Sequence, residues 1–194
     1  IQTGILWHLG STAIAVNSVA TTVFQIVTVF IYASASAAAV MIGKTIGEGH
    51  MELIRPYART FQALFLCVGF SSGLFLFFLK DPVILLFSEL SPESVAMTLQ
   101  FMTVLAVTTV GTAYQMPCLT GIVRAGGETD FVLKNDLFFM WLLVLPSSFL
   151  AAFVFHLSPL AVFICLKSDQ ILKCAVAAYK VNRYTWIKVI SRDV

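Results

Sequence analysis

Charged residues are excluded from long blocks of this chain. Four segments contain no Asp, Glu, Lys or Arg: residues 1–43, 60–79, 94–123 and 137–166. About 20 consecutive apolar residues cross the hydrocarbon core of a bilayer as an α-helix, and each segment is at least that long. The charged residues lie between these segments and near the C-terminal end. The pattern therefore predicts an integral membrane protein with an all-α fold.

Helix-breaking residues divide the apolar sequence into five predicted transmembrane helices. These helices span residues 13–42, 57–79, 94–123, 131–155 and 160–179, and a tail follows over 180–194. Glycines just after residue 42 and prolines near the other boundaries are typical of helix ends. The fifth helix differs from the others because Lys167, Asp169 and Lys173 interrupt its apolar sequence. The predicted architecture is a membrane helical bundle.

The basic residues indicate which loops lie in the cytoplasm. Three Lys or Arg residues follow the first predicted helix, one follows the second, two follow the third and none follows the fourth, while the tail holds four. Alternate loops therefore total nine against one. The positive-inside rule places residues 44–59, 124–134 and the tail in the cytoplasm. We expect a multi-pass protein of the cell (inner) membrane with a cytoplasmic C-terminus.

The composition narrows the class of function. Hydrophobic residues make up 59% of the chain, charged residues 11%, and the formal net charge is only +2, which argues against a nucleic-acid partner. The four cysteines form no C-x-x-C pair, so neither a zinc site nor a disulfide framework is indicated. The sequence contains no H-E-x-x-H or G-x-S-x-G motif of a hydrolase. We therefore expect no enzyme activity, no cofactor and no metal site.

Charged side chains inside the predicted helices are candidates for function. Asp136 lies near the start of the fourth helix, and Asp169 precedes Lys173 by four residues in the fifth. A charge at the bilayer centre costs roughly 2.5 to 3.5 kcal/mol on insertion scales, so these groups are expected to face protein or water. Asp136 suits either an ion or solute path or a position near the cytoplasmic interface. For Asp169 and Lys173 we favour a structural pair, because residues four apart share a helix face.

Uncharged polar residues form a second set of candidates. Asn17, Thr21 and Gln25 follow one another at four-residue spacing and therefore share one face of the first helix. Tyr114 and Gln115 lie in the third helix. Such residues suit a water-filled ion or solute path, and they suit hydrogen bonding between helices equally well. Spacing does not separate the two interpretations.

Two prolines lie inside the predicted helices. Pro117 and Pro146 each lack the N–H that an α-helix uses to bond the carbonyl four residues earlier. Each proline is therefore expected to mark either a hinge in a moving helix or a static kink that serves packing.

Several segments resemble the C-terminal lobe of the multidrug and toxic compound extrusion (MATE) transporters. They are LGSTAIAVNSVATTVF and GKTIGEGH, then LTGIVRAGGETDFVLKNDLFFMWLLVLP, and then KVNRYTWIK near the end. The most specific piece is the turn that begins at Arg124 and contains Gly126 and Gly127, together with Trp141 and Pro146 in the next helix. We expect one glycine of this turn to have a positive φ.

The resemblance implies a fold, a function and a missing partner. In that family twelve helices form two lobes around a central cavity, so the five helices here correspond to the last five, and residues 1–10 to the end of the helix before them. The function implied is export of small organic cations or drugs in exchange for Na⁺ or H⁺, with the N-terminal lobe of the same protein as partner and membrane lipid around both. Some members carry a cation-binding aspartate about eleven residues before the arginine, where residues 111–115 here hold no acid.

Two other functions compete with this interpretation. A lipid-linked saccharide flippase of the same superfamily is expected to hold several basic residues in its cavity, and no Lys or Arg lies in the first four predicted helices. A membrane module that transports nothing, such as a receptor or an assembly factor, belongs to a different class. Solute-dependent transport by the complete protein distinguishes that class from the other two.

Overall fold

The computed structural model describes residues 11–86 and 92–188, and helices are the only regular elements within these ranges. The first three are α2 (Ser11–Gly47), α3 (Met51–Leu86) and α4 (Pro92–Met116), and α4 continues into the π-helical segment η1 (Pro117–Val123). The next span consists of α5 (Thr129–Phe138), η2 (Phe139–Val144), α6 (Leu145–Phe149) and η3 (Leu150–Val154). The last elements are α7 (Pro159–Lys167) and α8 (Asp169–Arg183). Residues 1–10, expected to end a preceding helix, and the tail beyond 188 lie outside the described residues.

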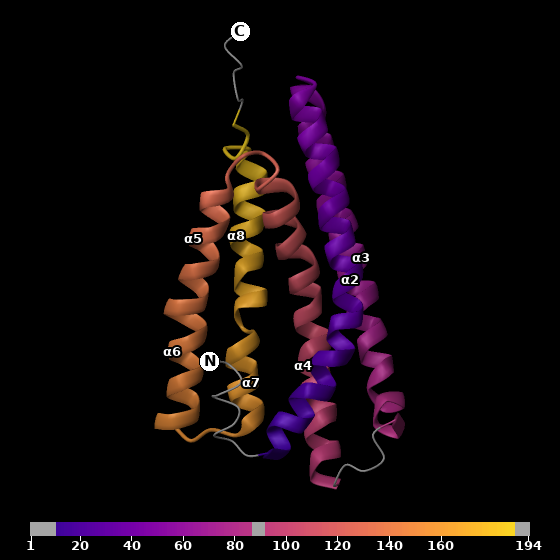
Figure 1. The fold of residues 1–194 in the computed structure, drawn as a ribbon, viewed down its shortest axis with the longest axis vertical. Helices are drawn as coiled ribbons and strands as arrows, with labels where there is room; N and C mark the ends of the chain where they lie inside the picture. The colour runs from indigo at the N-terminus through magenta and orange to yellow at the C-terminus, as the bar shows by residue number, and fades with distance from the viewer. Residues whose placement is uncertain (1–10, 87–91, 189–194) are drawn as a thin grey trace.

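The helices run along one common axis, with α4 packed against α2, α3, α7 and α8 (Figure 1). Among the described residues, four helical spans are long and apolar enough to cross a membrane: Ala20–Gly47, Met51–Pro82, Ser94–Val123 and Thr129–Val154. The fifth predicted helix is divided at Ser168 into α7 and α8, which follow one another along the same direction (Figure 1). The prediction of an all-α membrane bundle is confirmed.

Several helices extend beyond the ends expected from the sequence. Helix α2 continues past Gly43 to Gly47, and the chain turns at Gly49, which has a φ of 79°. Helix α3 includes both Pro56 and Pro82. Ending a helix within a membrane span leaves backbone groups unpaired, which is costly. Continuing the helix through a glycine costs only about 1 kcal/mol, so α2 continues past Gly43. Both prolines are near the ends of α3, and each leaves the carbonyl four residues earlier without its helical donor.

The two prolines inside the predicted spans lie in or beside π-helical segments. Pro117 is the first residue of η1, and Pro146 lies in the short helix α6 between η2 and η3. A proline removes one backbone donor, and a change to wider helical turns is one way for a helix to accommodate that loss. The sequence therefore indicated where these helices become irregular, while a hinge at either proline stays a prediction.

Small residues bring the helix backbones close together. A Cβ atom built on Gly73 of α3 would lie 2.7 Å from the Ala106 carbonyl oxygen of α4, and one built on Gly121 of η1 would lie 2.7 Å from the Ala35 carbonyl oxygen of α2. Any larger side chain at these positions would push the helices apart. Close approach of small residues is a common basis of helix packing in membranes, where the hydrophobic effect does not drive association.

The turn between η1 and α5 is covered by the segment after α8. Gly127 has a φ of 100°, as expected for one glycine of this turn. The Trp186 side chain is completely buried, and its ring occupies the space beside Gly126 where a Cβ atom would otherwise lie. The Lys188 N–H donates to the Gly126 carbonyl at 2.9 Å, and the indole N–H of Trp186 donates to the Val181 carbonyl at 3.0 Å. These contacts close one end of the bundle.

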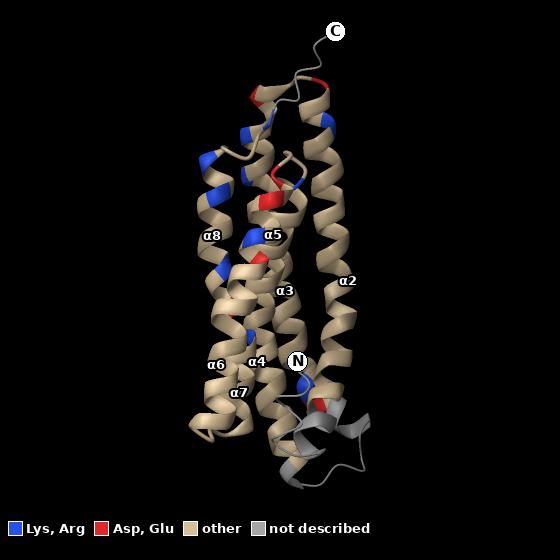
Figure 2. Cartoon of the chain, turned by 60° about the vertical axis from the view of Figure 1, so that its left-hand side comes forward, with Lys and Arg blue, Asp and Glu red and all other residues tan. Residues whose placement is uncertain are grey.

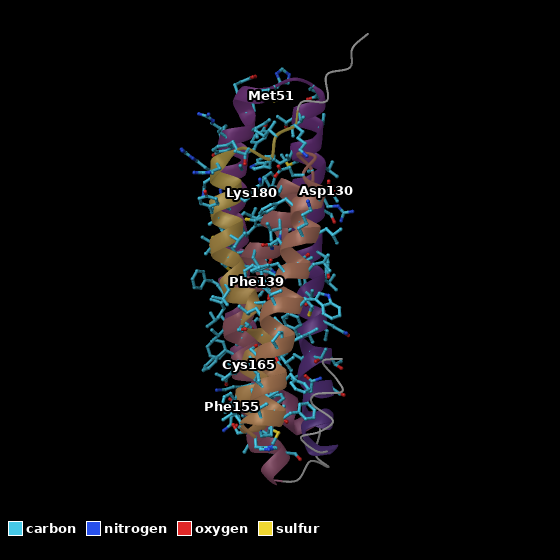
Figure 3. All side chains as sticks on the ribbon, turned by 90° about the vertical axis from the view of Figure 1, so that its left-hand side faces the viewer. Met51, Asp130, Phe139, Phe155, Cys165 and Lys180 are labelled. Carbon is cyan, nitrogen blue, oxygen red and sulfur yellow. The ribbon has the colours of Figure 1, made fainter. Side chains whose placement is uncertain are left out.

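Charged side chains are unevenly distributed along the bundle. Lys and Arg gather toward the end that carries the C-terminus, and few charged residues lie along the rest of the bundle (Figure 2). Figure 3 places Met51, Asp130 and Lys180 toward that end and Phe155 toward the other, with Phe139 between them. Many large apolar side chains are exposed along the helices, among them Phe30, Phe78 and Leu142. Such a surface is suited to contact with lipid or with another membrane helix.

Candidate functional site

Three charged side chains meet about midway along the bundle. The Lys173 Nζ atom of α8 lies 2.9 Å from Asp136 Oδ1 of α5 and 3.2 Å from Asp169 Oδ2 of its own helix. The Lys173 and Asp169 side chains are 8% and 6% exposed, whereas the Asp136 side chain is 52% exposed. Lys173 also lies 5.7 Å from the centre of the Phe139 ring, which is far from both bundle ends (Figure 3). The expected Asp169–Lys173 contact is present, and Asp136 joins it to form a three-residue charge cluster.

A glutamine connects this charge cluster to α4. The Gln170 amide nitrogen donates to both carboxylate oxygens of Asp169 at 3.0 Å. Its amide oxygen accepts a hydrogen bond from the Thr112 hydroxyl at 3.0 Å and another from the Gln115 amide at 3.2 Å. A continuous polar chain therefore runs from Asp136 through Lys173, Asp169 and Gln170 to α4. Its members carry the correct donors and acceptors to hold a buried charge pair in place.

Tyr114, next to Gln115 in the sequence, belongs to a different polar group. Its hydroxyl donates to the Gln62 amide oxygen of α3 at 2.8 Å. The Asn182 amide of α8 lies 3.4 Å from the same oxygen, and Gln62 in turn donates to Asn182 at 3.4 Å. This group ties α3, α4 and α8 together. Tyr114 and Gln115 are adjacent along the chain but point toward different neighbours, so the structure does not bring them into one site.

The polar residues of α2 stand apart from both groups. Gln25 is exposed and Asn17 is partly buried. Among the described residues, neither side chain makes a hydrogen bond, and the hydroxyls of Thr22 and Thr28 donate to carbonyls of their own helix. Arg124, expected at the turn, is exposed and lines a hollow of about 660 Å³ between α2 and η1. The candidates from the sequence are thus distributed over several places, and only Asp136 and Gln115 share one polar chain.

A small pocket lies on the α2 side of that chain. It has a volume of about 220 Å³ and is bordered by α2, α4, α7 and α8, with Gln115, Gln170 and Lys167 in its lining. Two larger hollows, of about 870 and 600 Å³, have almost entirely apolar linings and involve α3. Sequence patterns did not indicate Gln170 or Asn182, because an amide in a membrane helix carries no pattern that identifies its partner.

Comparison with known proteins identifies the family. The family model described as MatE matches residues 1–150. The multidrug resistance protein MdtK of Pectobacterium atrosepticum is 29% identical over 116 residues, which are 60% of this chain and 25% of that protein. MdtK of Edwardsiella ictaluri is 24% identical over 151 residues, which are 78% of this chain and 33% of that protein. No solved structure gives a significant match.

The chain spans between a quarter and a third of the length of these curated relatives. The matched region nevertheless extends from residue 1 through most of the described helices and includes Asp136 and the turn at Gly126. The match agrees with the all-α membrane architecture and with the resemblance found in the sequence. Since the family model covers well over half of the residues, this chain belongs to the MatE family.

Proposed function

We propose that this chain is the C-terminal lobe of a secondary active exporter that moves small organic cations or drugs outward in exchange for Na⁺ or H⁺. The observation that carries the proposal is the MatE match over residues 1–150. The two relatives are named as multidrug resistance proteins, which supports drugs as the substrate class. A transporter of this kind works by moving one helical lobe against another around a site near the bilayer midplane. This lobe therefore requires an N-terminal partner lobe.

The proposed orientation places the turn at Gly126 and Gly127 in the cytoplasm. Lys and Arg gather at that end of the bundle (Figure 2), which supports this orientation through the positive-inside rule. The lobe then spans the inner membrane several times with its C-terminus in the cytoplasm. Gln25 and Asn17 on α2 are proposed to border the solute path, as is Gln115 at the pocket. Tyr114 joins that path only when its hydrogen bond to Gln62 breaks.

Asp136 is the proposed ion-coupling residue of this lobe. Two carboxylates, Asp136 and Asp169, share one ammonium group, that of Lys173, so the charge cluster has one negative charge in excess. An excess charge at membrane depth is costly, and a bound Na⁺ ion or a proton would neutralise it. Asp169 is enclosed by Lys173 and Gln170, whereas the Asp136 side chain is half exposed. Asp136 is therefore the member of the charge cluster that an entering ion can reach.

A transport assay with the complete protein tests the proposal. The transporter is reconstituted in liposomes, a Na⁺ or H⁺ gradient is imposed, and movement of ethidium, a planar organic cation, is followed by fluorescence. We expect gradient-driven transport, which a non-transporting membrane module would not show. Asp136→Asn should reduce transport or shift its dependence on Na⁺ or pH. The control is Asp130→Asn, because Asp130 is exposed in the first turn of α5, and this variant should transport normally.

The two parts of the proposal fail in different ways. Absence of ethidium movement under every gradient, in protein that is folded, would contradict the assignment as an organic cation exporter. Normal transport by Asp136→Asn across Na⁺ and pH titrations would remove Asp136 as the coupling residue but would leave the exporter assignment intact.

A further inference from the structure

We propose that the groove formed by α3, α4 and α8 binds one anionic phospholipid from the cytoplasmic leaflet, with an acyl chain in the groove and the phosphate against arginines at its cytoplasmic end. The groove is the larger of the two apolar hollows described above, with a volume of about 870 Å³. The inference goes beyond the proposed function, because the groove lies on a different face of α4 from the small pocket and lipid binding requires no transport.

Helix α4 forms the floor of the groove, and α3 and α8 form its two walls. Helix α4 lies between them in Figure 1 and packs against both. A Cβ atom on Gly73 of α3 would lie 2.7 Å from the Ala106 carbonyl oxygen. A Cβ atom on Gly111 of α4 would lie 2.6 Å from the Gln170 carbonyl oxygen. Although both walls approach α4 this closely, Val107 on the floor is 59% exposed, so the groove is open to the surrounding membrane.

The side chains of the α3 wall favour a lipid chain over a further helix as the occupant. Phe70, Leu74 and Phe77 line the groove and are exposed. Helices in membranes associate through small residues that let their backbones approach, and through polar side chains that hydrogen-bond across the interface. Bulky side chains on this wall keep a helix backbone away, and the lining offers almost no polar group. A flexible acyl chain fits between such side chains and needs no hydrogen bonds.

Two exposed arginines continue the α3 wall toward the cytoplasmic end. Leu66, Arg59 and Arg55 follow one another at spacings of seven and four residues, so they share one face of α3. At about 1.5 Å per residue, Arg59 lies about 22 Å along the helix from Leu74 of the groove. Half of a bilayer that measures about 40–45 Å with its headgroups has the same depth. A phospholipid with its phosphate at Arg59 therefore places its acyl chain along the groove.

The arginines at this end have donors available for a phosphate. Arg183 is the last residue of α8, so each wall of the groove leads to a basic side chain. Within the described ranges, none of Arg55, Arg59 and Arg183 forms an ion pair with an acid. Arg55 and Arg183 lie 5.2 and 4.7 Å from the centres of the Tyr184 and Tyr179 rings. Cation–π contacts of this kind leave guanidinium N–H groups free.

The surroundings of the arginines suit a phospholipid headgroup. Glu52 lies on the same side of α3 one turn further from the groove, and its carboxylate contacts His50 at 3.2 Å. Gln62 and Asn182 hydrogen-bond to each other across the two walls, between Arg59 and the groove, at the depth where a phospholipid carries its ester groups. A guanidinium group matches phosphate with two parallel hydrogen bonds. Basic sites between membrane helices on the cytoplasmic side attract anionic headgroups in this way.

Photo-crosslinking with the full 194-residue chain in phosphatidylcholine liposomes tests the site. The probe is phosphatidylglycerol with a diazirine midway along one acyl chain, and the comparison lipid is phosphatidylcholine with the same photoreactive chain. Leu74 in the groove and Leu142, outside it on η2, are 58% and 67% exposed, so they form a matched pair. We expect the anionic probe to label Leu74 at least about fivefold more than Leu142, and the phosphatidylcholine probe to label both alike. Unlabelled phosphatidylglycerol should compete, whereas glycerol 3-phosphate, which has no acyl chain, should not.

Variants separate a specific phosphate contact from the overall charge. The double variant Arg59→Gln with Arg183→Gln should lower labelling of Leu74 by the anionic probe at least about fivefold. The control is Lys44→Gln with Lys134→Gln, which removes two positive charges from exposed positions on α2 and α5 and should label normally. Circular dichroism and size-exclusion chromatography show whether each variant folds.

Three results would each overturn the proposal. One is equal labelling of Leu74 and Leu142 by the anionic probe. Another is unchanged labelling of Leu74 in the folded double arginine variant. The third is absence of labelling in the groove by either lipid, which would indicate that a protein segment covers it.

Discussion

Lys173 is the residue whose removal should destabilise the bundle most among the three members of its charge cluster. Replacing it by Met leaves Asp169, 6% exposed, without a cation. Removal of one partner from a buried ion pair typically costs about 3–5 kcal/mol, because the other charge remains uncompensated. Asp136 contributes less to this cost, since its side chain is 52% exposed and can be hydrated. We therefore expect Lys173→Met to lower the free energy of unfolding by about 3–5 kcal/mol.

The two acids should differ from each other for the same reason. Asp169→Asn leaves Lys173 in contact with Asp136 at 2.9 Å, so the expected loss is about 2 kcal/mol rather than the full cost of an unpaired buried charge. Asp136→Asn leaves Lys173 with Asp169, and an interaction with a half-exposed group is worth about 1 kcal/mol or less. The sequence predicted only the Asp169–Lys173 pair, and the additional contact of Lys173 with Asp136 is what limits the cost of losing Asp169.

The double variant Lys173→Met with Asp169→Asn separates charge from packing. It removes both buried charges and keeps an amide partner for Gln170, so it should recover most of the stability lost in Lys173→Met. Unfolding is measured by SDS titration in mixed micelles. The control is Lys44→Met, because Lys44 is 71% exposed and its contact with Glu48 should contribute almost nothing. If Asp136→Asn destabilises the protein as much as Lys173→Met, or if the double variant recovers nothing, the reasoning is refuted.

Three further predictions concern the ends of the bundle. Gly126→Val should reduce folded yield severely, because the new side chain would overlap the Trp186 ring. The control Gly43→Val should be tolerated, because no atom lies within 4 Å of its added Cβ. Equal folded yields of the two variants would contradict this prediction. Gly49 is unsuitable as the control for Gly126, because its φ of 79° would strain any residue with a Cβ atom. Trp186→Ala should lower the free energy of unfolding by about 3–5 kcal/mol, measured by the same SDS titration, because the side chain is fully buried; a loss below 1 kcal/mol would argue against the closure seen at this end. Single cysteines at Glu52 and Asp81, in a cysteine-free background, should react with an impermeant maleimide from opposite sides of the membrane, and labelling from one side would contradict the topology.

Local sequence patterns predicted the features that depend on neighbouring residues. The uncharged segments located the spans, because the cost of burying charge in lipid acts on each stretch separately. The four-residue spacing of Asp169 and Lys173 predicted their contact, since both lie on one helix. Pro117 and Pro146 indicated where their helices become irregular. Each of these inferences needs only the chain within one or two turns of a helix.

Features that join distant segments could not be predicted in the same way. Asp136 and Lys173 are 37 positions apart, and Tyr114 and Gln62 are 52 positions apart. Their contacts depend on how far each helix is rotated about its axis and on the depth at which it packs. Those two quantities are set by close contacts such as that of Gly121 with Ala35, which involve many side chains at once. The small pocket at Lys167 arises from the same packing and has no signature in the sequence.

The central claim is that this chain is one lobe of a two-lobe exporter, and reconstitution tests it most directly. Liposomes containing either the 194-residue chain alone or the complete transporter receive the same Na⁺ or H⁺ gradient, and ethidium movement is compared at equal amounts of folded protein. Alternating access needs two lobes, so we predict gradient-driven movement with the complete transporter and none above empty liposomes with the chain alone. Gradient-driven ethidium movement by the chain alone would contradict the claim.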